Sequence, residues 1–423
     1  RFYFARENME NRNDDFNVVK VDMRRKGASQ HMQNRIQTSI DSGIYSVKII
    51  PQNTDDHLFP SMCVPVAGMI DRFRNEGVTF FGSKAFKYPS YLSQSGILFP
   101  KVYSETDIGR KSFLDCVIKF DLNNVHNVVT GIVESIRQNT QTENGVLIAL
   151  ELCLSEITDN VLVHSLPSHI PQERACGYVM AQIHHNPERI VVSVYDNGQG
   201  ILKSFSNSKY KPNSSIDAIK LSLRKNVTSG AGQGRGMWML SSIVESSEGY
   251  VEISSDKAKL TVQKRPDYEE SVQRESVINT HIEGTTRVDF WINAEKEIDI
   301  KKALHGYEPT DLWLEWHEDD SNNTVVLKVK DESYGTGSRF SGKHFRNKVL
   351  NTSKQTKRPV VIDFEGTSLI SSSYADELIG GIVEKIGIVG FMARFSLANL
   401  GENNAFIIEE ALRTRIIQNE LGK

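Results

Sequence analysis

Hydrophobic residues in the first part of the chain switch between strand-like and helix-like spacing. Alternating spacing predicts strands over 16–23, 44–50 and 78–82, and spacing of three to four predicts helices over 29–42 and 63–74. This β-α-β-α-β order is typical of a parallel or mixed sheet. We therefore expect residues 1–115 to form an N-terminal α/β domain.

The middle of the chain carries a second set of elements, which we place in a domain over residues 116–295. Hydrophobic spacing predicts helices over 124–138, 146–165 and 237–246, and strands over 176–185, 190–195, 250–255 and 285–292. The polar stretch 202–229 predicts a long loop, and loops of that length are usually functional or disordered. The charged insert 262–278 predicts no element. Together the elements favour an α/β two-layer sandwich.

The last part of the chain repeats the element order of the first. After a linker over 296–322, a domain over 323–423 is predicted to contain strands at 324–330, 359–364 and 391–397, and helices at 338–350 and 371–386. The match lies in the pattern and not in the residues. It predicts that two related α/β domains flank the central one.

Composition narrows the classes of protein that the chain can belong to. With a net charge of −3, no overall field attracts nucleic acid, and basic clusters such as 24–26 and 354–358 are short enough to be solvated loops. The four cysteines form no C-x-x-C pair, so we expect no zinc site or disulfide framework but a reducing, cytoplasmic environment. Cys153 falls in an apolar helical pattern and is interpreted as a small buried hydrophobic residue. We find no signal-peptide pattern and no apolar run of the roughly 18 residues that a membrane span needs.

The first of three short polar segments lies on the helix predicted over 146–165. Glu156 and Asn160 are four residues apart, so both side chains project from one face. An asparagine oxygen is a suitable ligand for Mg²⁺, and a nearby carboxylate can orient or deprotonate an attacking water or hydroxyl. An isolated pair with this spacing is more often a solvated helix face.

The second segment, Asp196-Asn-Gly198-Gln-Gly200, follows a strand rich in β-branched residues. An aspartate at a strand end can accept a hydrogen bond from the exocyclic amine of adenine. The two glycines let the backbone approach a base where a Cβ would clash. The alternative is a tight Asp-Asn-Gly turn without a ligand.

The third segment is a glycine-rich loop that leads into the helix predicted over 237–246. Its glycines are Gly230, Gly232, Gly234 and Gly236, with Arg235 among them. A glycine-rich loop at a helix N-terminus offers backbone N–H groups to phosphate, and Arg235 adds a positive charge. The spacing fits neither a P-loop nor a dinucleotide-binding fold. A flexible linker is the alternative. A last pair, Gly284-Thr285, precedes a strand, where Thr285 can hold a water near Asp196.

In this order, the segments resemble the N, G1, G2 and G3 boxes of the GHKL (Bergerat-fold) ATPase superfamily, over about residues 120–293. The superfamily includes gyrase B, MutL, histidine kinases and anti-sigma-factor serine kinases. The resemblance implies a Mg-ATP pocket. By this resemblance, Glu156 corresponds to the general base and Asn160 to the magnesium ligand. Asp196, Gly198 and Gly200 correspond to the adenine site. Gly232, Gly234 and Gly236 correspond to the phosphate-facing lid, and Thr285 to the threonine near the base.

The sequence after Asn160 is more similar to the anti-sigma-factor kinases than to the histidine kinases. His164 resembles a structural or lid-contacting residue, and His126 lacks the context of a phosphoacceptor. The C-terminal region, over about 338–417, resembles STAS-like domains, and the repeated element order extends that comparison to the N-terminal domain. Ser372 matches the position of the phosphorylated serine in anti-sigma-factor antagonists, but its flanking residues differ. We favour the alternative that these serines only cap a helix.

These observations leave several functions open. The leading hypothesis is an ATP-dependent conformational switch, in which Mg-ATP orders the lid over 202–232 and signals to STAS-like domains or to a second subunit of a homodimer. A serine/threonine protein kinase acting on Ser372 or on a partner is the alternative. A third is a binding module with a degenerate pocket. A nucleic-acid role has the least support. A bacterial stress or defence setting rests on family analogy alone.

Overall fold

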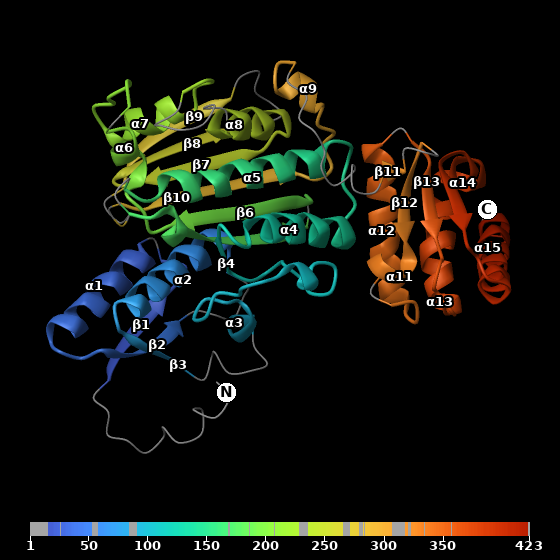
Figure 1. The fold of residues 1–423 in the computed structure, drawn as a ribbon, viewed down its shortest axis with the longest axis horizontal. Helices are drawn as coiled ribbons and strands as arrows, with labels where there is room; N and C mark the ends of the chain where they lie inside the picture. Colours follow the sequence, from blue (N-terminus) through green and yellow to red (C-terminus); the bar gives the residue numbers. More distant parts are fainter. Residues whose placement is uncertain are drawn as a thin grey trace.

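The structure of the chain is a computed structural model, shown in Figure 1. It describes residues 16–25, 27–52, 58–83, 91–167, 170–185, 187–206, 208–227, 236–264, 271–278, 282, 284–306, 318–319, 323–333, 335–356 and 358–421. Strands within these ranges form three sheets, of three, seven and four strands. None of the helices in these ranges combines the length and the hydropathy of a membrane span.

The N-terminal unit has the β-α-β-α-β order predicted from the sequence. Its elements are β1 (Asn17–Asp22), α1 (Ala28–Asp41), β2 (Ser46–Gln52), α2 (Pro60–Asn75), β3 (Thr79–Gly82) and the short α3 (Tyr91–Gln94). The strands pair in parallel in the order β1-β2-β3. Most residues of α2 are buried, including an unbroken run from Cys63 to Asp71, so its buried surface extends around much of the helix. A helix of this kind must be covered on more than one side.

A seven-stranded sheet forms the centre of the molecule. Its elements are β4 (Ile118–Asp121), α4 (Val125–Asn139), α5 (Val146–His164), β5 (Cys176–His184), β6 (Arg189–Asp196), α6 (Gly200–Ser204), α7 (Ser215–Ser222), α8 (Gly236–Ser246), β7 (Tyr250–Ser255), β8 (Ala258–Gln263), β9 (Val272–Val277) and β10 (Thr286–Asn293). The order is β4-β5-β6-β10-β7-β8-β9 and every pair is antiparallel. Helices α4, α5 and α8 cover one face (Figure 1).

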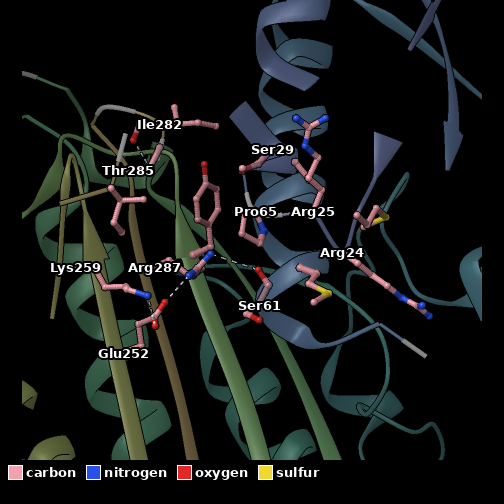
Figure 2. Close-up of a pocket in the computed structure, with 16 residues that line it drawn as sticks. Arg24, Arg25, Ser29, Ser61, Pro65, Glu252, Lys259, Ile282, Thr285 and Arg287 are labelled. Carbon is pink, nitrogen blue, oxygen red and sulfur yellow. Dashed lines mark hydrogen bonds and ion pairs between the residues drawn. The ribbon is translucent and has the colours of Figure 1, made fainter. Parts of the chain in front are cut away.

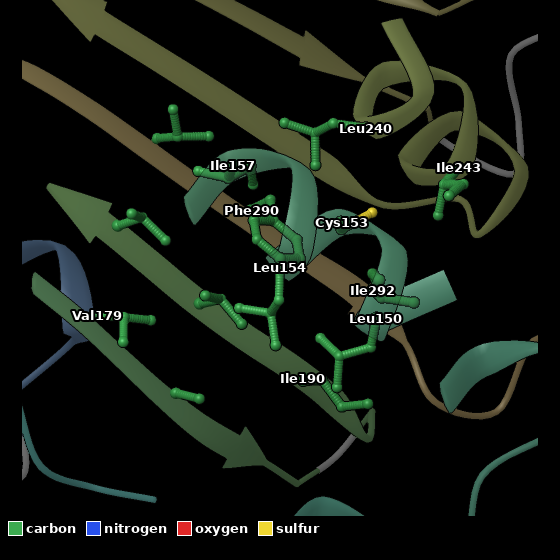
Figure 3. Close-up of a cluster of buried hydrophobic side chains, with 14 of the residues drawn as sticks. Leu150, Cys153, Leu154, Ile157, Val179, Ile190, Leu240, Ile243, Phe290 and Ile292 are labelled. Carbon is green, nitrogen blue, oxygen red and sulfur yellow. The ribbon is translucent and has the colours of Figure 1, made fainter. Parts of the chain in front are cut away.

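The core of this central unit lies between the sheet and the helix α5. Leu150, Cys153, Leu154 and Ile157 of α5 are buried against strand residues such as Phe290, as Figure 3 shows. Alternate residues of each strand face this core because side chains in a strand point to opposite faces in turn. The two-layer arrangement predicted for this region is therefore confirmed. Cys153 is a buried free thiol, as expected.

The other face of the central sheet is covered by the N-terminal unit. Helix α2 packs across β5 and β6. The hydrophobic core of the N-terminal unit therefore includes Tyr178, Met180 and Tyr195 from the central sheet. Gly68 of α2 lies so close to this face that an added Cβ would be 2.7 Å from the Tyr195 ring. A larger residue there would push the helix off the sheet.

The C-terminal unit is a second parallel α/β layer. Its elements are β11 (Glu318–Asp319), β12 (Thr324–Lys328), α11 (Val329–Glu332), α12 (Arg339–Gln355), β13 (Val360–Asp363), α13 (Ser372–Ala375), a π-helical turn (Asp376–Gly380), α14 (Gly381–Arg394), β14 (Phe395–Ala398) and α15 (Glu402–Leu421). Strands β12, β13 and β14 pair in parallel, and β11 is antiparallel to β12. The predicted class, an α/β protein with flanking parallel α/β units, is confirmed.

Four local predictions differ from the structure. The stretch 202–229, predicted as a loop, contains the end of α6 and the helix α7. The insert 262–278 contributes the end of β8 and the edge strand β9, whose residues are mostly exposed and so lack an apolar pattern. The predicted linker over 296–322 contains the short helix α9 (Ile300–Ala303) and the two-residue strand β11. The helix predicted over 371–386 continues to Arg394 through a break at Gly387, which has a positive φ of 75°, so the strand predicted over 391–397 begins only at Phe395.

Candidate nucleotide-binding site

Glu156 and Asn160 lie on the side of α5 that faces α8. Gly236 begins α8 so close to them that an added Cβ would be 2.5 Å from Glu156 Oε2 and 3.1 Å from Asn160 Nδ2. Asn160 Nδ2 is buried and has no hydrogen-bond partner among the described residues. A buried amide without a partner costs free energy, which a ligand at this position would recover. The structure thus brings Glu156, Asn160 and the end of the glycine-rich loop together.

Asp196 lies at the end of β6, on the face of the sheet that carries the helices. Its side chain is buried, and the backbone N–H of Gly198 donates to Asp196 Oδ1 at 2.8 Å. Burial raises the pKa of this carboxyl to about 7, although hydrogen bonds from the Gly198 and Thr286 backbones lower it in part. A buried carboxyl with a perturbed pKa is typical of functional sites.

The two glycines after Asp196 are required by close contacts. A Cβ on Gly198 would lie 2.4 Å from the Ser165 carbonyl oxygen and 2.5 Å from Asp196 Oδ1. Gly200 has a positive φ of 77°, and a Cβ there would lie 2.8 Å from Asp256 Oδ1. Both positions therefore exclude larger residues, which argues for a specific built loop rather than a generic turn.

This loop is tied to the C-terminal end of α5. The Gln199 N–H donates to Ser165 O at 2.7 Å, and Gln199 Nε2 donates to the carbonyls of His164 at 2.9 Å and Leu166 at 3.0 Å. Burial lowers the pKa of the His164 ring, which favours the neutral imidazole. These contacts fit a structural role for His164. Gln199 was not singled out from the sequence, because a glutamine between two glycines carries no local signal.

The Gly284-Thr285 pair takes a different position from the one expected. Gly284 lies beside the loop, and its N–H donates to Asp256 Oδ1 at 3.0 Å. Thr286, however, is the residue directly opposite Asp196 in the antiparallel register, so its side chain shares the Asp196 face. Thr285 precedes it, lies with Tyr195 on the opposite face, and donates its hydroxyl hydrogen to Ile282 O at 2.7 Å. The structure does not bring the Thr285 side chain to Asp196.

Asp256 and Thr286 are the residues of this site that sequence reasoning missed. Asp256 has a positive φ of 53° in the turn between β7 and β8, where its carboxylate holds Gly284 and receives the Ser215 hydroxyl at 3.3 Å. Its position shows only in the fold, because β7 and β6 are far apart in the sequence. Thr286 was missed because Gly284-Thr285-Thr286 offers two adjacent threonines, and only the strand register distinguishes them.

Several predicted site residues fall outside the described parts of the chain. Gly230, Gly232, Gly234 and Arg235 are among them, so their contribution to a phosphate loop stays a prediction. Ser372 is described, is exposed and occupies the first turn of α13. The cap of that helix is its neighbour Ser371, whose hydroxyl accepts from the Tyr374 N–H at 3.1 Å.

The residues present suit Mg-ATP. Within the described ranges, no three His, Cys, Asp or Glu side chains converge on a possible metal site. A metal with a single asparagine ligand would need oxygens from a ligand such as phosphate, which is how Mg²⁺ is commonly held. The side-chain oxygen of Asn160 suits the ion, its unpartnered Nδ2 and the glycine at 236 suit phosphate oxygens, and the buried Asp196 suits a base.

Comparison with protein families agrees with this geometry. The family described as "Histidine kinase-, DNA gyrase B-, and HSP90-like ATPase" matches residues 145–296, and the family described as "STAS-like domain of unknown function" matches residues 341–405. The chain therefore contains a GHKL-type ATPase domain followed by a STAS-like domain. A search among curated proteins found no significant match.

Comparison with solved structures found topoisomerase ATPase regions. The ATPase region of Saccharomyces cerevisiae topoisomerase II bound to dexrazoxane is 14% identical, with 37% of this chain and 41% of that one covered and a TM-score of 0.22. The topoisomerase IV ATP-binding domain of Francisella tularensis, in complex with an inhibitor, is 15% identical, with 48% and 86% covered and a TM-score of 0.21. The chain thus spans about two-fifths of the length of the yeast structure.

Proposed function

We propose that the protein is an ATP-dependent conformational switch, in which Mg-ATP bound to the central domain controls the C-terminal STAS-like domain. The observation that carries the proposal is the contact of Gly236 with Glu156 and Asn160. This close approach places the end of the glycine-rich loop, Gly236, beside a carboxylate and beside an amide whose Nδ2 has no hydrogen-bond partner among the described residues. Those are the groups that phosphate, water activation and a magnesium ion require.

Each residue has a distinct role in the proposal. Asn160 ligates Mg²⁺ through its amide oxygen, and Glu156 orients or deprotonates the attacking water. Asp196 accepts from the adenine amine, while Gly198 and Gly200 let the backbone lie against the base. Thr286, rather than Thr285, holds the water between Asp196 and the base, because its side chain shares the Asp196 face. Bound Mg²⁺ would supply charge neutralisation for the phosphates.

Transmission to the STAS-like domain is supported by a polar contact between α4 and α12. Lys348 Nζ, on α12, lies 2.6 Å from Glu134 Oε1 on α4, and both side chains are buried. Asn351 Nδ2 donates to the carbonyls of Arg137 at 3.0 Å and Thr140 at 2.9 Å, at the end of α4. The two helices therefore share an interface with fixed geometry.

The same interface holds the chain segment that connects α4 to α5. Asn351 Oδ1 accepts from the Thr142 N–H at 3.0 Å. Lys354 Nζ, also on α12, donates to Glu143 Oε1 at 2.9 Å. Helix α5, which carries the predicted magnesium ligand, begins at Val146 directly after this segment. A displacement of α5 on ATP binding would thus move the connecting segment and, through these contacts, α12.

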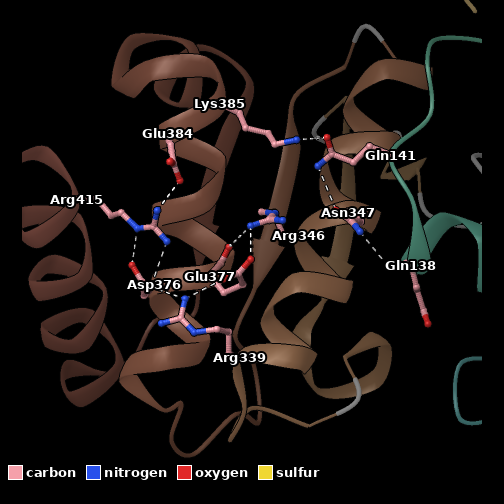
Figure 4. Close-up of polar contacts among 10 residues, drawn as sticks. All are labelled: Gln138, Gln141, Arg339, Arg346, Asn347, Asp376, Glu377, Glu384, Lys385 and Arg415. Carbon is pink, nitrogen blue, oxygen red and sulfur yellow. Dashed lines mark hydrogen bonds and ion pairs between the residues drawn. The ribbon is translucent and has the colours of Figure 1, made fainter. Parts of the chain in front are cut away.

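Figure 4 shows further contacts across this interface. The side-chain amide of Gln141, in the same connecting segment, donates to Asn347 Oδ1 at 3.1 Å and accepts from Lys385 Nζ of α14. Asn347 Nδ2 in turn donates to the Gln138 carbonyl at 3.2 Å. Two helices of the STAS-like domain therefore hold the segment before α5.

A magnesium-dependent ATP assay tests the proposal. Wild type and Glu156→Gln would be compared for phosphate release and for transfer of label from ATP to protein. We expect slow phosphate release that is lost in Glu156→Gln and kept in Asp159→Asn, a control that neutralises an exposed carboxylate on the same helix. Equal release by wild type and Glu156→Gln, or no ATP binding at all, would overturn the proposal.

A protein-serine kinase is the second candidate, and the exposure of Ser372 at the first turn of α13 is the observation that favours it. A phosphate at a helix N-terminus is stabilised by the helix dipole and the free N–H groups. Label on the protein that disappears in Ser372→Ala, but not in Ser353→Ala, would establish this function. Homodimer formation, as in many GHKL proteins, is part of the proposal and is tested by light scattering with and without ATP.

A further inference from the structure

A pocket of about 270 Å³ lies at the seam between the N-terminal unit and the central sheet, on the face opposite to Asp196. One wall is formed by the start of α1 and by α2, and the other by β7, β8 and β10 (Figure 2). The proposed ATP site does not use it. Its volume is close to the lower end of the range for small-molecule pockets.

The side chains that line this pocket carry an excess of positive charge. Of the sixteen described residues that line it, Arg24, Arg25, Lys259 and Arg287 are cationic, and Glu252 is the one acid. Arg25 is exposed and forms no ion pair with any described residue. A concave site lined by one sign of charge attracts ligands of the opposite sign.

Two of these four cations are already neutralised, because Asp289 pairs with Arg287 at 2.7 Å and Glu252 pairs with both Arg287 and Lys259. Glu252 Oε1 receives Arg287 at 2.9 Å, and its Oε2 receives Lys259 at 2.9 Å and the Tyr250 hydroxyl at 2.8 Å. These partners lower the pKa of the carboxyl, although burial opposes them, so it stays ionised and occupied. Arg25, on the N-terminal wall, therefore supplies a positive charge to the cavity.

Two further features point to an anion. The Tyr195 hydroxyl is buried in the pocket wall and has no hydrogen bond of normal geometry to a described residue, with the Thr285 hydroxyl its polar neighbour. Gly27, at the pocket, is the N-cap of α1; the Ala28 N–H donates to the Arg25 carbonyl at 3.0 Å, and no described side chain caps the first turn. A buried hydroxyl donor and an uncapped helix N-terminus both gain from a bound anion.

From these contacts we propose that the seam pocket binds a small organic phosphate, with its phosphate group between Arg25, Tyr195 and the start of α1. The apolar part of the ligand would lie against Met62 and Ile282, which also line the cavity. Because Tyr195 directly precedes Asp196 on β6, a ligand here would contact the strand that carries the adenine-binding residue. The site does not depend on the proposed ATPase function.

Calorimetric titration of the full chain with phenyl phosphate and with inorganic phosphate, at constant ionic strength, tests this site. We expect both to bind, and Arg25→Ala and Tyr195→Phe each to weaken binding about tenfold, the size of effect of one charge-assisted hydrogen bond. Arg35→Ala is the matched control, because it removes an exposed arginine elsewhere on α1. Asn160→Ala is the control for the ATP site.

The outcomes separate clearly. Weaker binding in Arg25→Ala and Tyr195→Phe, with Arg35→Ala and Asn160→Ala unchanged, supports the pocket. Tighter binding of phenyl phosphate than of inorganic phosphate assigns a phosphate ester, whereas equal binding assigns free phosphate. No binding by wild type, equal weakening in Arg35→Ala, or loss in Asn160→Ala alone would overturn the proposal.

Discussion

The central domain is held at two seams of different chemistry. Towards the N-terminal unit, most of the contact is apolar, between α2 and Tyr178, Met180 and Tyr195 of the sheet. Asp71 of α2 adds a polar contact, since it receives Lys119 at 2.7 Å and the Tyr178 hydroxyl at 2.8 Å. Towards the C-terminal unit, α4 meets α12 through buried polar groups, among them Glu134, Lys348 and Asn351. The seam with the N-terminal unit resembles the interior of a domain, whereas the seam with the C-terminal unit resembles an interface held by specific polar pairs.

This difference separates a fixed seam from one that can switch. Apolar packing tolerates small shifts and gains free energy from burial alone. A buried charged network depends on the geometry of each pair, so it favours one orientation and loses much free energy when a member moves. We therefore expect ATP to act through the α4–α12 contact and to leave the N-terminal unit in place.

The largest expected effect is at Lys348, which pairs with Glu134 at 2.6 Å and Glu332 at 2.9 Å. Lys348→Met leaves two largely buried carboxylates without this cation, so we expect the free energy of unfolding to fall by about 3–5 kcal/mol. Urea denaturation measures this. Lys343→Met, on an exposed position of the same helix, should change stability by less than about 0.5 kcal/mol.

A second substitution sharpens the test of the polar seam. Adding Glu332→Gln to Lys348→Met removes one of the stranded charges and should recover part of the loss. If the double variant is as unstable as the sum of the single ones, charge pairing is not what holds this seam.

The next effect is at the apolar seam. Met180 is fully buried between the sheet and α2, so Met180→Ala should lower the free energy of unfolding by about 2–5 kcal/mol through lost burial and a cavity. Met392→Ala, at an exposed methionine of α14, serves as the control. An unchanged denaturation midpoint for Met180→Ala would show that the N-terminal unit is not packed as described.

The third effect is a pH dependence from Asp196, whose pKa is raised to about 7 by burial. In the proposed site its ionised form accepts from the adenine amine, so we expect ATP affinity to fall about tenfold between pH 8 and pH 6. In the free protein the sign is opposite, because the folded state binds the extra proton. The contribution of this group to stability is present below its unfolded-state pKa of about 4 and is lost as pH rises through 7.

Calorimetry at several pH values measures the affinity, and denaturation curves measure the stability. Asp196→Asn should remove both dependences. A pH-independent affinity in wild type would contradict the assignment of Asp196 to the adenine site.

The smallest effect compares two adjacent hydroxyls on opposite faces of the sheet at the start of β10. Thr286→Val should weaken ATP binding about fivefold, the size of one lost hydrogen bond, because its side chain shares the Asp196 face. Thr285→Val should leave ATP binding unchanged. Weaker ATP binding in Thr285→Val, with Thr286→Val unchanged, would show that Thr285 and not Thr286 holds the water near the base.

Local patterns in the sequence predicted most helices and strands and the clustered site motifs, because buried faces and glycine loops leave local signals. Thr286 and Asp256 were not found, since strand register and a turn from a distant strand place them. The edge strand β9 was missed because its exposed residues carry no apolar period. The seam pocket could not be predicted from the sequence either, since Arg25 and Tyr195 line one cavity only because the N-terminal unit packs on the sheet.

Calorimetric titration of ATP, with and without magnesium, into wild type and Asn160→Ala tests the central claim most directly. Asp159→Asn, an exposed neighbour on α5, is the control. We predict that wild type and the control bind ATP more tightly with magnesium, and that Asn160→Ala loses this dependence. Absence of ATP binding by wild type, or the same magnesium dependence in Asn160→Ala, would contradict the account.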